Sequence, residues 1–89
     1  MFKISQAEEA DGAVTFKLEG RLVGPWVGEL TRLCEPYFGT RQPIRLDLAD
    51  ISFADTDGVA ALSHLKSRGV LVFNCTPFVE QQLKNPAVG

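Results

Sequence analysis

Strand-like and helix-like segments alternate along most of this sequence. Strands are predicted at residues 2–7, 13–22, 44–48 and 70–73, and helices at residues 25–35, 59–65 and 77–84. The first two strands form a hairpin around Asp11-Gly12, and strands separated by helices pair in parallel through right-handed crossovers. The sequence therefore predicts an α/β fold with the order β-β-α-β-α-β-α. Its small mixed sheet is mostly parallel, with an antiparallel first strand.

The apolar residues of the predicted strands indicate how the helices cover the sheet. Val14, Phe16 and Leu18 alternate with polar residues, and residues 44–48 repeat the pattern. This period of two is typical of strands with one buried face. We therefore expect the helices mainly on one face of the sheet and water on the other. Residues 70–73 are continuously apolar, which predicts a more fully buried strand.

Helix signals define the ends of the predicted helices. Pro25 and Pro77 suit a first helical position, and Gly69 suits the C-terminal cap of the second helix. Thr76 is the expected N-cap of the last helix, and residues 85–89 are expected to fray. An apolar stripe at helical spacing predicts the core contacts of the first helix: Trp26, Leu30, Leu33, Cys34 and Tyr37. Trp26 is assigned to the core, although a partly exposed tryptophan could anchor a partner.

Length and charge exclude several classes of function. The chain of 89 residues has room for one core, which predicts a single domain over residues 1–89. Its net charge is −2 and its nine Lys and Arg residues are scattered, so a nucleic-acid partner is not expected. No apolar run approaches the roughly 20 residues that cross a bilayer, and no signal peptide is recognisable. We expect a cytoplasmic protein without membrane insertion.

The two cysteines do not indicate a metal or redox site. Cys34 and Cys75 lack metal-ligand spacing and are expected to be reduced core residues. His64, the single histidine, lies on another predicted helix than Cys34, and no nucleophile–base pair is evident. No metal and no cofactor are therefore predicted.

The segment Asp55-Thr56-Asp57-Gly58 is the main candidate site. It lies between a predicted strand and a predicted helix, where open α/β sheets display functional groups. Paired carboxylates could share acid and base roles or bind a metal. However, Asp47 is expected to face solvent and Asp50 to lie in a loop, so no catalytic set can be assembled. Asp and Thr are also favoured helix caps, although capping needs only one such residue.

At this segment the sequence resembles the STAS domains, which comprise anti-sigma factor antagonists and cytoplasmic domains of sulfate transporters. The strand at 44–48, followed by Asp55-Thr56-Asp57-Gly58-Val59, is similar to the family signature. The element order matches over nearly the whole chain, and Glu19-Gly20-Arg21-Leu22 resembles a Gly-x-Leu segment of the family. Val23 stands where these domains carry an Asp. The resemblance implies a STAS fold and a non-enzymatic module that binds another protein.

The resemblance also assigns roles within the motif. In the antagonists it typically reads Asp-Ser-Ser-Gly-Leu, and a partner anti-sigma kinase phosphorylates the second serine. Asp55 matches the motif aspartate, Thr56 the first serine and Gly58 the glycine, so Asp57 occupies the phospho-acceptor position. A serine kinase cannot phosphorylate a carboxylate, and one charge only partly imitates a phosphate. Asp57 is then either phosphomimetic or part of an unswitched site, with Thr56 a candidate acceptor or a helix cap.

A second resemblance implies a different partner. Small STAS subunits of bacterial ABC-type lipid transporters carry Asp-Thr-x-Gly and bind the ATPase subunit through the following helix. Asp55-Thr56-Asp57-Gly58 fits that pattern as well. The sequence therefore leaves two partner classes, an anti-sigma kinase and an ABC ATPase. An enzyme that uses the two carboxylates is a third, less favoured alternative.

Overall fold

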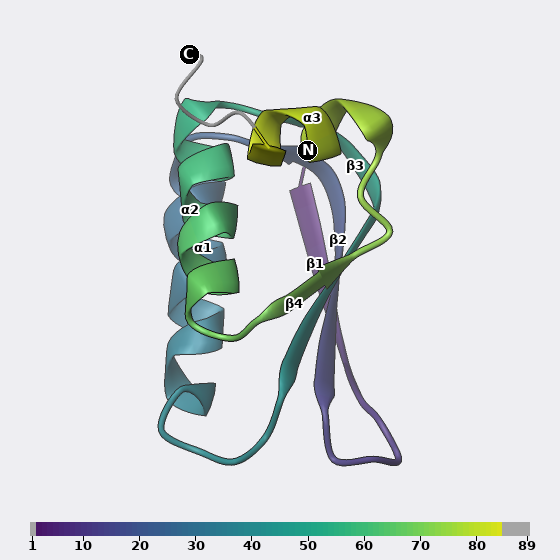
Figure 1. The fold of residues 1–89 in the computed structure, drawn as a ribbon, viewed down its shortest axis with the longest axis vertical. Coiled ribbons are helices and arrows are strands. Elements are labelled where there is room, and N and C mark those ends of the chain that lie inside the picture. Colours follow the sequence, from purple (N-terminus) through teal and green to yellow (C-terminus); the bar gives the residue numbers. More distant parts are fainter. Residues whose placement is uncertain (1, 85–89) are drawn as a thin grey trace.

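Residues 2–84 are described by the computed structural model, and their elements follow the predicted order (Figure 1). The elements are β1 (Phe2–Glu8), β2 (Val14–Leu22), α1 (Pro25–Cys34), a 3-10 turn η1 (Glu35–Tyr37), β3 (Ile44–Ala54), α2 (Thr56–Ser67), β4 (Leu71–Phe73) and α3 (Pro77–Lys84). The tail that was expected to fray lies outside the described residues. No helix within residues 2–84 combines the length and the apolar character that crossing a bilayer requires.

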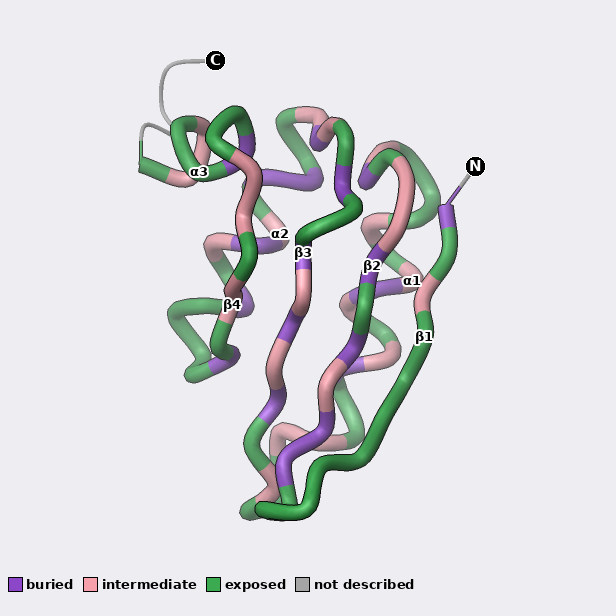
Figure 2. The backbone as a smooth tube through the Cα atoms, turned by 90° about the vertical axis from the view of Figure 1, so that its right-hand side faces the viewer, coloured by how far each residue is buried: buried purple, intermediate pink, exposed green. Residues whose placement is uncertain are grey.

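The sheet has the predicted mixed topology. Its strand order is β1-β2-β3-β4, with β1 antiparallel to β2 and the remaining neighbours parallel. Because consecutive strands are neighbours, right-handed crossovers place α1 and α2 on the same face (Figure 1). The other face of the sheet is open, as the view onto it shows (Figure 2). Helices mainly on one face are therefore confirmed.

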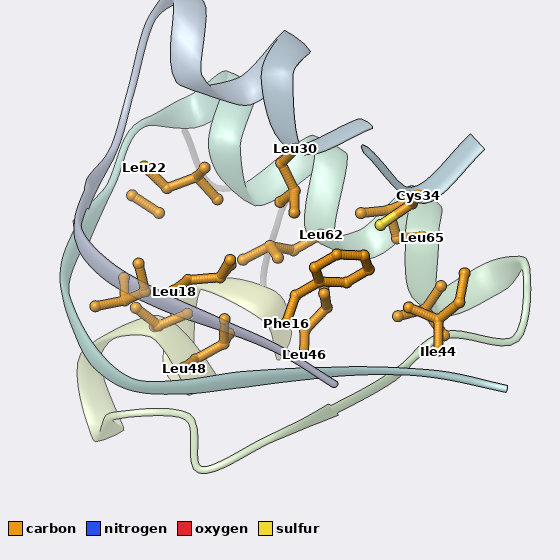
Figure 3. Packing of buried hydrophobic residues seen from close by; sticks show 14 of the residues in the cluster. Phe16, Leu18, Leu22, Leu30, Cys34, Ile44, Leu46, Leu48, Leu62 and Leu65 are labelled. Carbon is orange, nitrogen blue, oxygen red and sulfur yellow. The ribbon is translucent and has the colours of Figure 1, made fainter. Parts of the chain in front are cut away.

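The core lies between the sheet and the two covering helices. Figure 3 shows the Phe16 ring between side chains of the sheet, such as Leu46, and of α2, such as Leu62. Cys34 is also fully buried, and this burial raises the pKa of its thiol to about 11. Cys75 is only half-buried at the edge of the core. The predicted packing role is thus confirmed for Cys34 and only partly for Cys75.

The third strand is longer than the sequence predicts. It extends to Ala54, so Asp50 lies within β3 and not in a loop. The pairing of β2 with β3 shifts register between Lys17 and Glu19 and again between Gly20 and Arg21. Such bulges interrupt the alternation of apolar residues, which explains why the alternation in the sequence ends at Leu48 although the strand continues. They also bend the strands near their carboxyl ends, where the candidate site lies (Figure 1).

The fourth strand is not the buried strand that its apolar run predicts. It comprises only three residues at an edge of the sheet, and Leu71 is 55% exposed. Val70 lies just before the strand, where its N–H donates to the Leu65 carbonyl at 3.1 Å, and Gly69 adopts a positive φ of 97°. The C-cap of α2 is Arg68, one residue before the predicted Gly69, and Gly69 follows it with the positive φ that ends the helix. The prediction of a buried fourth strand is wrong.

The first helix begins at Pro25 as predicted but differs from its prediction in its last residue and in the burial of Trp26. It is regular only to Cys34, and a 3-10 turn that contains Pro36 follows. Glu35 keeps helical dihedral angles, but Pro36 has no N–H to donate to the Arg32 carbonyl, so the α-helical hydrogen bonds end there. At the other end, the Trp26 side chain is 41% exposed and not in the core. Its ring stacks on Phe2 of β1, with 5.7 Å between the ring centroids. The apolar stripe thus has its buried part at Leu30 and Cys34, and Trp26 lies at its rim.

Candidate functional site

The junction between β3 and α2 is a single residue, Asp55. Its N–H donates to the carbonyl oxygen of Leu22 at 3.2 Å, which ties the end of β3 to the end of β2. The helix that follows therefore begins directly above the carboxyl ends of two parallel strands. This is the position at which open α/β sheets place ligand and partner sites.

The Asp55 carboxylate joins the N-termini of two helices. Its Oδ1 accepts a hydrogen bond from the Gly58 N–H at 2.7 Å, and this bond caps α2. Its Oδ2 accepts one from the N–H of Gly24, the residue that precedes α1, at 3.2 Å. Asp55 is thus the N-cap, and Thr56, the alternative cap in the sequence, is already inside the helix. Both carboxylate oxygens are occupied within the fold.

Gly58 is required by the close approach of α2 to β2. A Cβ atom at this position would lie 2.5 Å from the backbone oxygen of Leu22 and 3.2 Å from Asp55 Oδ1. Real Cβ atoms essentially never approach a backbone atom so closely, and backbone cannot move aside as a flexible side chain can. Glycine at this position therefore allows α2 to begin where Asp55 can cap it.

Thr56 and Asp57 point away from these contacts. Both residues are exposed in the first turn of α2. Within residues 2–84, the Thr56 hydroxyl forms no hydrogen bond and Asp57 forms no ion pair. The positive end of the helix dipole favours the Asp57 carboxylate there. The four residues singled out from the sequence therefore lie together, but only two of them are free to meet another molecule.

The other candidate carboxylates lie elsewhere. Asp47 accepts hydrogen bonds from the Ala49 N–H at 3.0 Å and from the Asn74 amide at 3.2 Å. Asp50 pairs with Lys17 at 3.3 Å. Because Lys17 alternates with the buried Phe16 and Leu18, this pair lies on the sheet face opposite to the core and α2. His64 is exposed, two turns further along α2 from Asp57. Within residues 2–84, no group of three or more His, Cys, Asp or Glu residues is placed to hold a metal ion.

Two residues near the motif were not assigned to it from the sequence. Gly24 donates to Asp55 although the two are 31 positions apart, and Trp26 follows in the first turn of α1. Gly24-Pro25 is recognisable as a helix start, and that signal predicts no contact with a distant carboxylate. The link depends on β2 and β3 being neighbours, which places the two helix N-termini at one end of the sheet (Figure 1).

Comparison with known proteins identifies a known structure with a similar fold. No protein-family model matches the sequence, and no curated protein is significantly similar to it. The structure is similar to that of the anti-sigma factor antagonist SpoIIAA in its unphosphorylated form, with a TM-score of 0.75. The similarity covers 92% of this chain and 82% of that chain at 16% sequence identity, and it therefore concerns the fold alone. The predicted STAS fold is confirmed.

Proposed function

We propose that this chain is a single STAS-like regulatory domain that binds another protein through the exposed N-terminal turn of α2. The proposal rests on one observation: two residues of the motif are bound within the fold and the other two are exposed. Asp55 and Gly58 are used within the fold, whereas Thr56 and Asp57 face outward without internal partners among the described residues. The likeness of the fold to that of SpoIIAA, an anti-sigma factor antagonist, supports a protein-binding role in general.

Asp57 gives the proposed docking surface a fixed negative charge. It occupies the position at which the antagonists resembled by the motif carry the phosphorylatable serine. A carboxylate has a charge of −1, whereas a phosphoserine carries about −1.5 to −2 and three acceptor oxygens. The domain is therefore not switched at residue 57, and its surface permanently keeps part of the charge of a phosphorylated site.

Capture of the partner tests this function. The wild-type chain is used as bait in the native cell extract, and the captured protein is identified, purified and titrated against the wild type and Asp57→Asn. An anti-sigma factor of the serine-kinase type supports the antagonist-like role. The binding constant is expected to change on Asp57→Asn, because the exposed charge is removed without changing the shape of the side chain. Equal binding by both chains contradicts a role for Asp57.

Asp57→Ser separates the two meanings of the fixed charge. If Asp57 imitates a phosphorylated serine, the variant gains affinity for a kinase partner and incorporates phosphate from ATP at residue 57. If the site is unswitched, the variant loses affinity and gains no phosphate. Phosphate on Thr56 of the wild type contradicts an unswitched site, and Thr56→Ala is the control that locates it.

An ABC ATPase is the second candidate partner. The specific feature in its favour is the Asp-Thr-x-Gly spacing of Asp55, Thr56 and Gly58, followed by the exposed residues of α2. Capture of an ATPase subunit together with its transporter, in place of an anti-sigma factor, selects this alternative. Substitutions at His64 on the exposed side of α2 are then expected to weaken capture as strongly as those at Asp57.

We propose that the domain is not an enzyme. The contacts of Asp47 and Asp50 support this. Asp47 accepts hydrogen bonds from the Ala49 N–H and the Asn74 amide, and Asp50 is paired with Lys17, so neither is a free catalytic partner for Asp57. A phosphatase or hydrolase activity that disappears in Asp57→Asn contradicts the proposal. The measurement uses a general phosphate ester, with the binding assay run on the same preparation.

A further inference from the structure

Trp26, the single tryptophan of the chain, is an exposed aromatic ring that the fold holds in place. It lies in the first turn of α1 and is 41% exposed. The ring stacks on the buried Phe2 with an interplanar angle of 27°. An aromatic ring that is already ordered loses little conformational entropy when a partner covers it. Such rings are frequent among the residues that dominate binding energy at protein interfaces.

Trp26 lies at the same end of the molecule as the exposed half of the motif. Gly24, two residues before Trp26, is hydrogen-bonded to Asp55, and Asp57 is two residues after Asp55. Each of these steps spans at most about 7 Å of chain. Moreover, α1 and α2 pack against each other with their N-termini at one end (Figure 1). A protein interface of ordinary size, about 800 Å² on each partner, can include both side chains.

We propose that Trp26 is the aromatic anchor of the docking surface whose charged part is Asp57. The matching partner is a protein with an apolar pocket for the indole ring beside a basic side chain for the carboxylate. We choose a basic side chain for the partner because of charge complementarity: Asp57 is exposed and has no ion pair among the described residues. The inference rests on the proposed protein-binding function and adds to it the chemistry of the partner.

Leu71 provides a control at the opposite end of the sheet. It is 55% exposed and is the first residue of β4. It pairs with Arg45 near the start of β3, whereas Asp55 and α2 follow the end of that strand at Ala54. Leu71 is thus at least as exposed as Trp26 and lies far from Asp57 along β3. A surface centred on Trp26 and Asp57 leaves it uncovered.

The experiment uses the whole chain labelled with 5-fluorotryptophan. Because there is one tryptophan, its ¹⁹F spectrum has one resonance, whatever tryptophans the unlabelled partner contains. The partner is the purified protein captured by the wild-type chain. We expect the resonance to shift on titration and to lose its H2O/D2O solvent shift. Trp26→Ala is expected to raise the Kd by about 30-fold or more, and Leu71→Ala to leave it within about twofold.

The outcomes separate this inference from the function on which it rests. If the partner binds in an Asp57-dependent way but the resonance does not change, the inference is overturned and the proposed function stands. If binding does not depend on Asp57, the proposed function itself fails. The ¹⁹F measurement needs no substitution, so a loss of stability in Trp26→Ala cannot mimic it. Trp26→Phe keeps an aromatic ring for the stack on Phe2 and is expected to bind with intermediate affinity.

Discussion

The segment 55–58 contains two residues that the fold uses internally and two that it leaves exposed. Asp55 and Gly58 contact β2 and the loop before α1, whereas Thr56 and Asp57 are exposed. The helical repeat explains the division. Residues three apart lie on the same side of a helix, so the N-cap and the third helical residue face the strand together. The two residues between them then face outward.

The comparison shows that two neighbouring aspartates at one helix N-terminus can have different roles. Asp55 uses both carboxylate oxygens to accept backbone N–H groups and thereby fixes the geometry of the junction. Asp57 has the same favourable interaction with the helix dipole, yet its oxygens remain available. Substitutions in the inward half should therefore change stability, and those in the outward half should change binding.

The largest expected effect is that of Gly58→Ala. Alanine normally stabilises a helix relative to glycine by up to about 1 kcal/mol. Here its Cβ collides with the Leu22 carbonyl, so we expect the free energy of unfolding to fall by roughly 1–3 kcal/mol, as in overpacked sites. Gly28→Ala in α1 is the matched control, since its Cβ meets nothing within 4 Å. Chemical denaturation measures the free energy of unfolding of both variants. If Gly58→Ala gains as much stability as Gly28→Ala, the close approach of α2 to Leu22 does not require glycine at residue 58.

Asp55→Ala should have the next largest effect. It removes the cap of α2, which costs about 0.5–2 kcal/mol of unfolding free energy, together with the hydrogen bond to Gly24. Asp55→Asn keeps a capping oxygen but loses the second acceptor, and an intermediate stability is expected. Thermal unfolding followed by circular dichroism ranks the three chains. If the asparagine variant is as stable as the wild type, the bond to Gly24 does not contribute.

Asp57→Asn should reduce stability by less than about 1 kcal/mol, the range of a charge–dipole interaction at a helix N-terminus. Its effect on partner binding should be larger than its effect on unfolding, because the carboxylate is exposed. Denaturation and a binding titration on the same preparation test this ratio. A variant that loses stability and binding in parallel would place Asp57 with the inward residues.

Thr56→Ala tests the other outward residue. Its hydroxyl forms no hydrogen bond among the described residues, and exposed sites of this kind change stability within about 0.5 kcal/mol. Near-normal denaturation is therefore expected. A destabilisation as large as that of Asp55→Ala would show that Thr56 contributes to the cap after all.

Asp11 offers a small, pH-dependent comparison at the opposite end of the sheet. Its carboxylate accepts the Ala13 N–H at 3.1 Å and pairs with Arg45 at 2.6 Å. The Ala13 hydrogen bond and then Arg45 lower its pKa in the folded state below the ordinary value of 3.8. A lowered pKa stabilises the fold above the unfolded pKa, and this contribution disappears as the pH falls through the folded pKa. The difference in Tm between wild type and Asp11→Asn should therefore shrink at acidic pH.

Local patterns predicted most of the fold correctly. The alternation around Phe16 and Leu46, the turn at Gly12 and the cap before Pro77 identify the right elements, because each signal depends on residues close in sequence. The failures occur at Asp50, Leu71 and Trp26. The continuation of β3 past a bulge, the edge position of β4 and the rim position of Trp26 all depend on neighbours distant in sequence.

The sequence by itself determined the order of the elements, the open sheet face and the composition of the segment 55–58. Only the tertiary structure decided which residues of that segment are free. Parallel pairing of β2 with β3 brings the Leu22 carbonyl to Gly58 and the Gly24 N–H to Asp55. These contacts bind Asp55 and Gly58 into the fold and leave Asp57 exposed. Local sequence could not predict this, because the contacts join segments that only the completed sheet brings together.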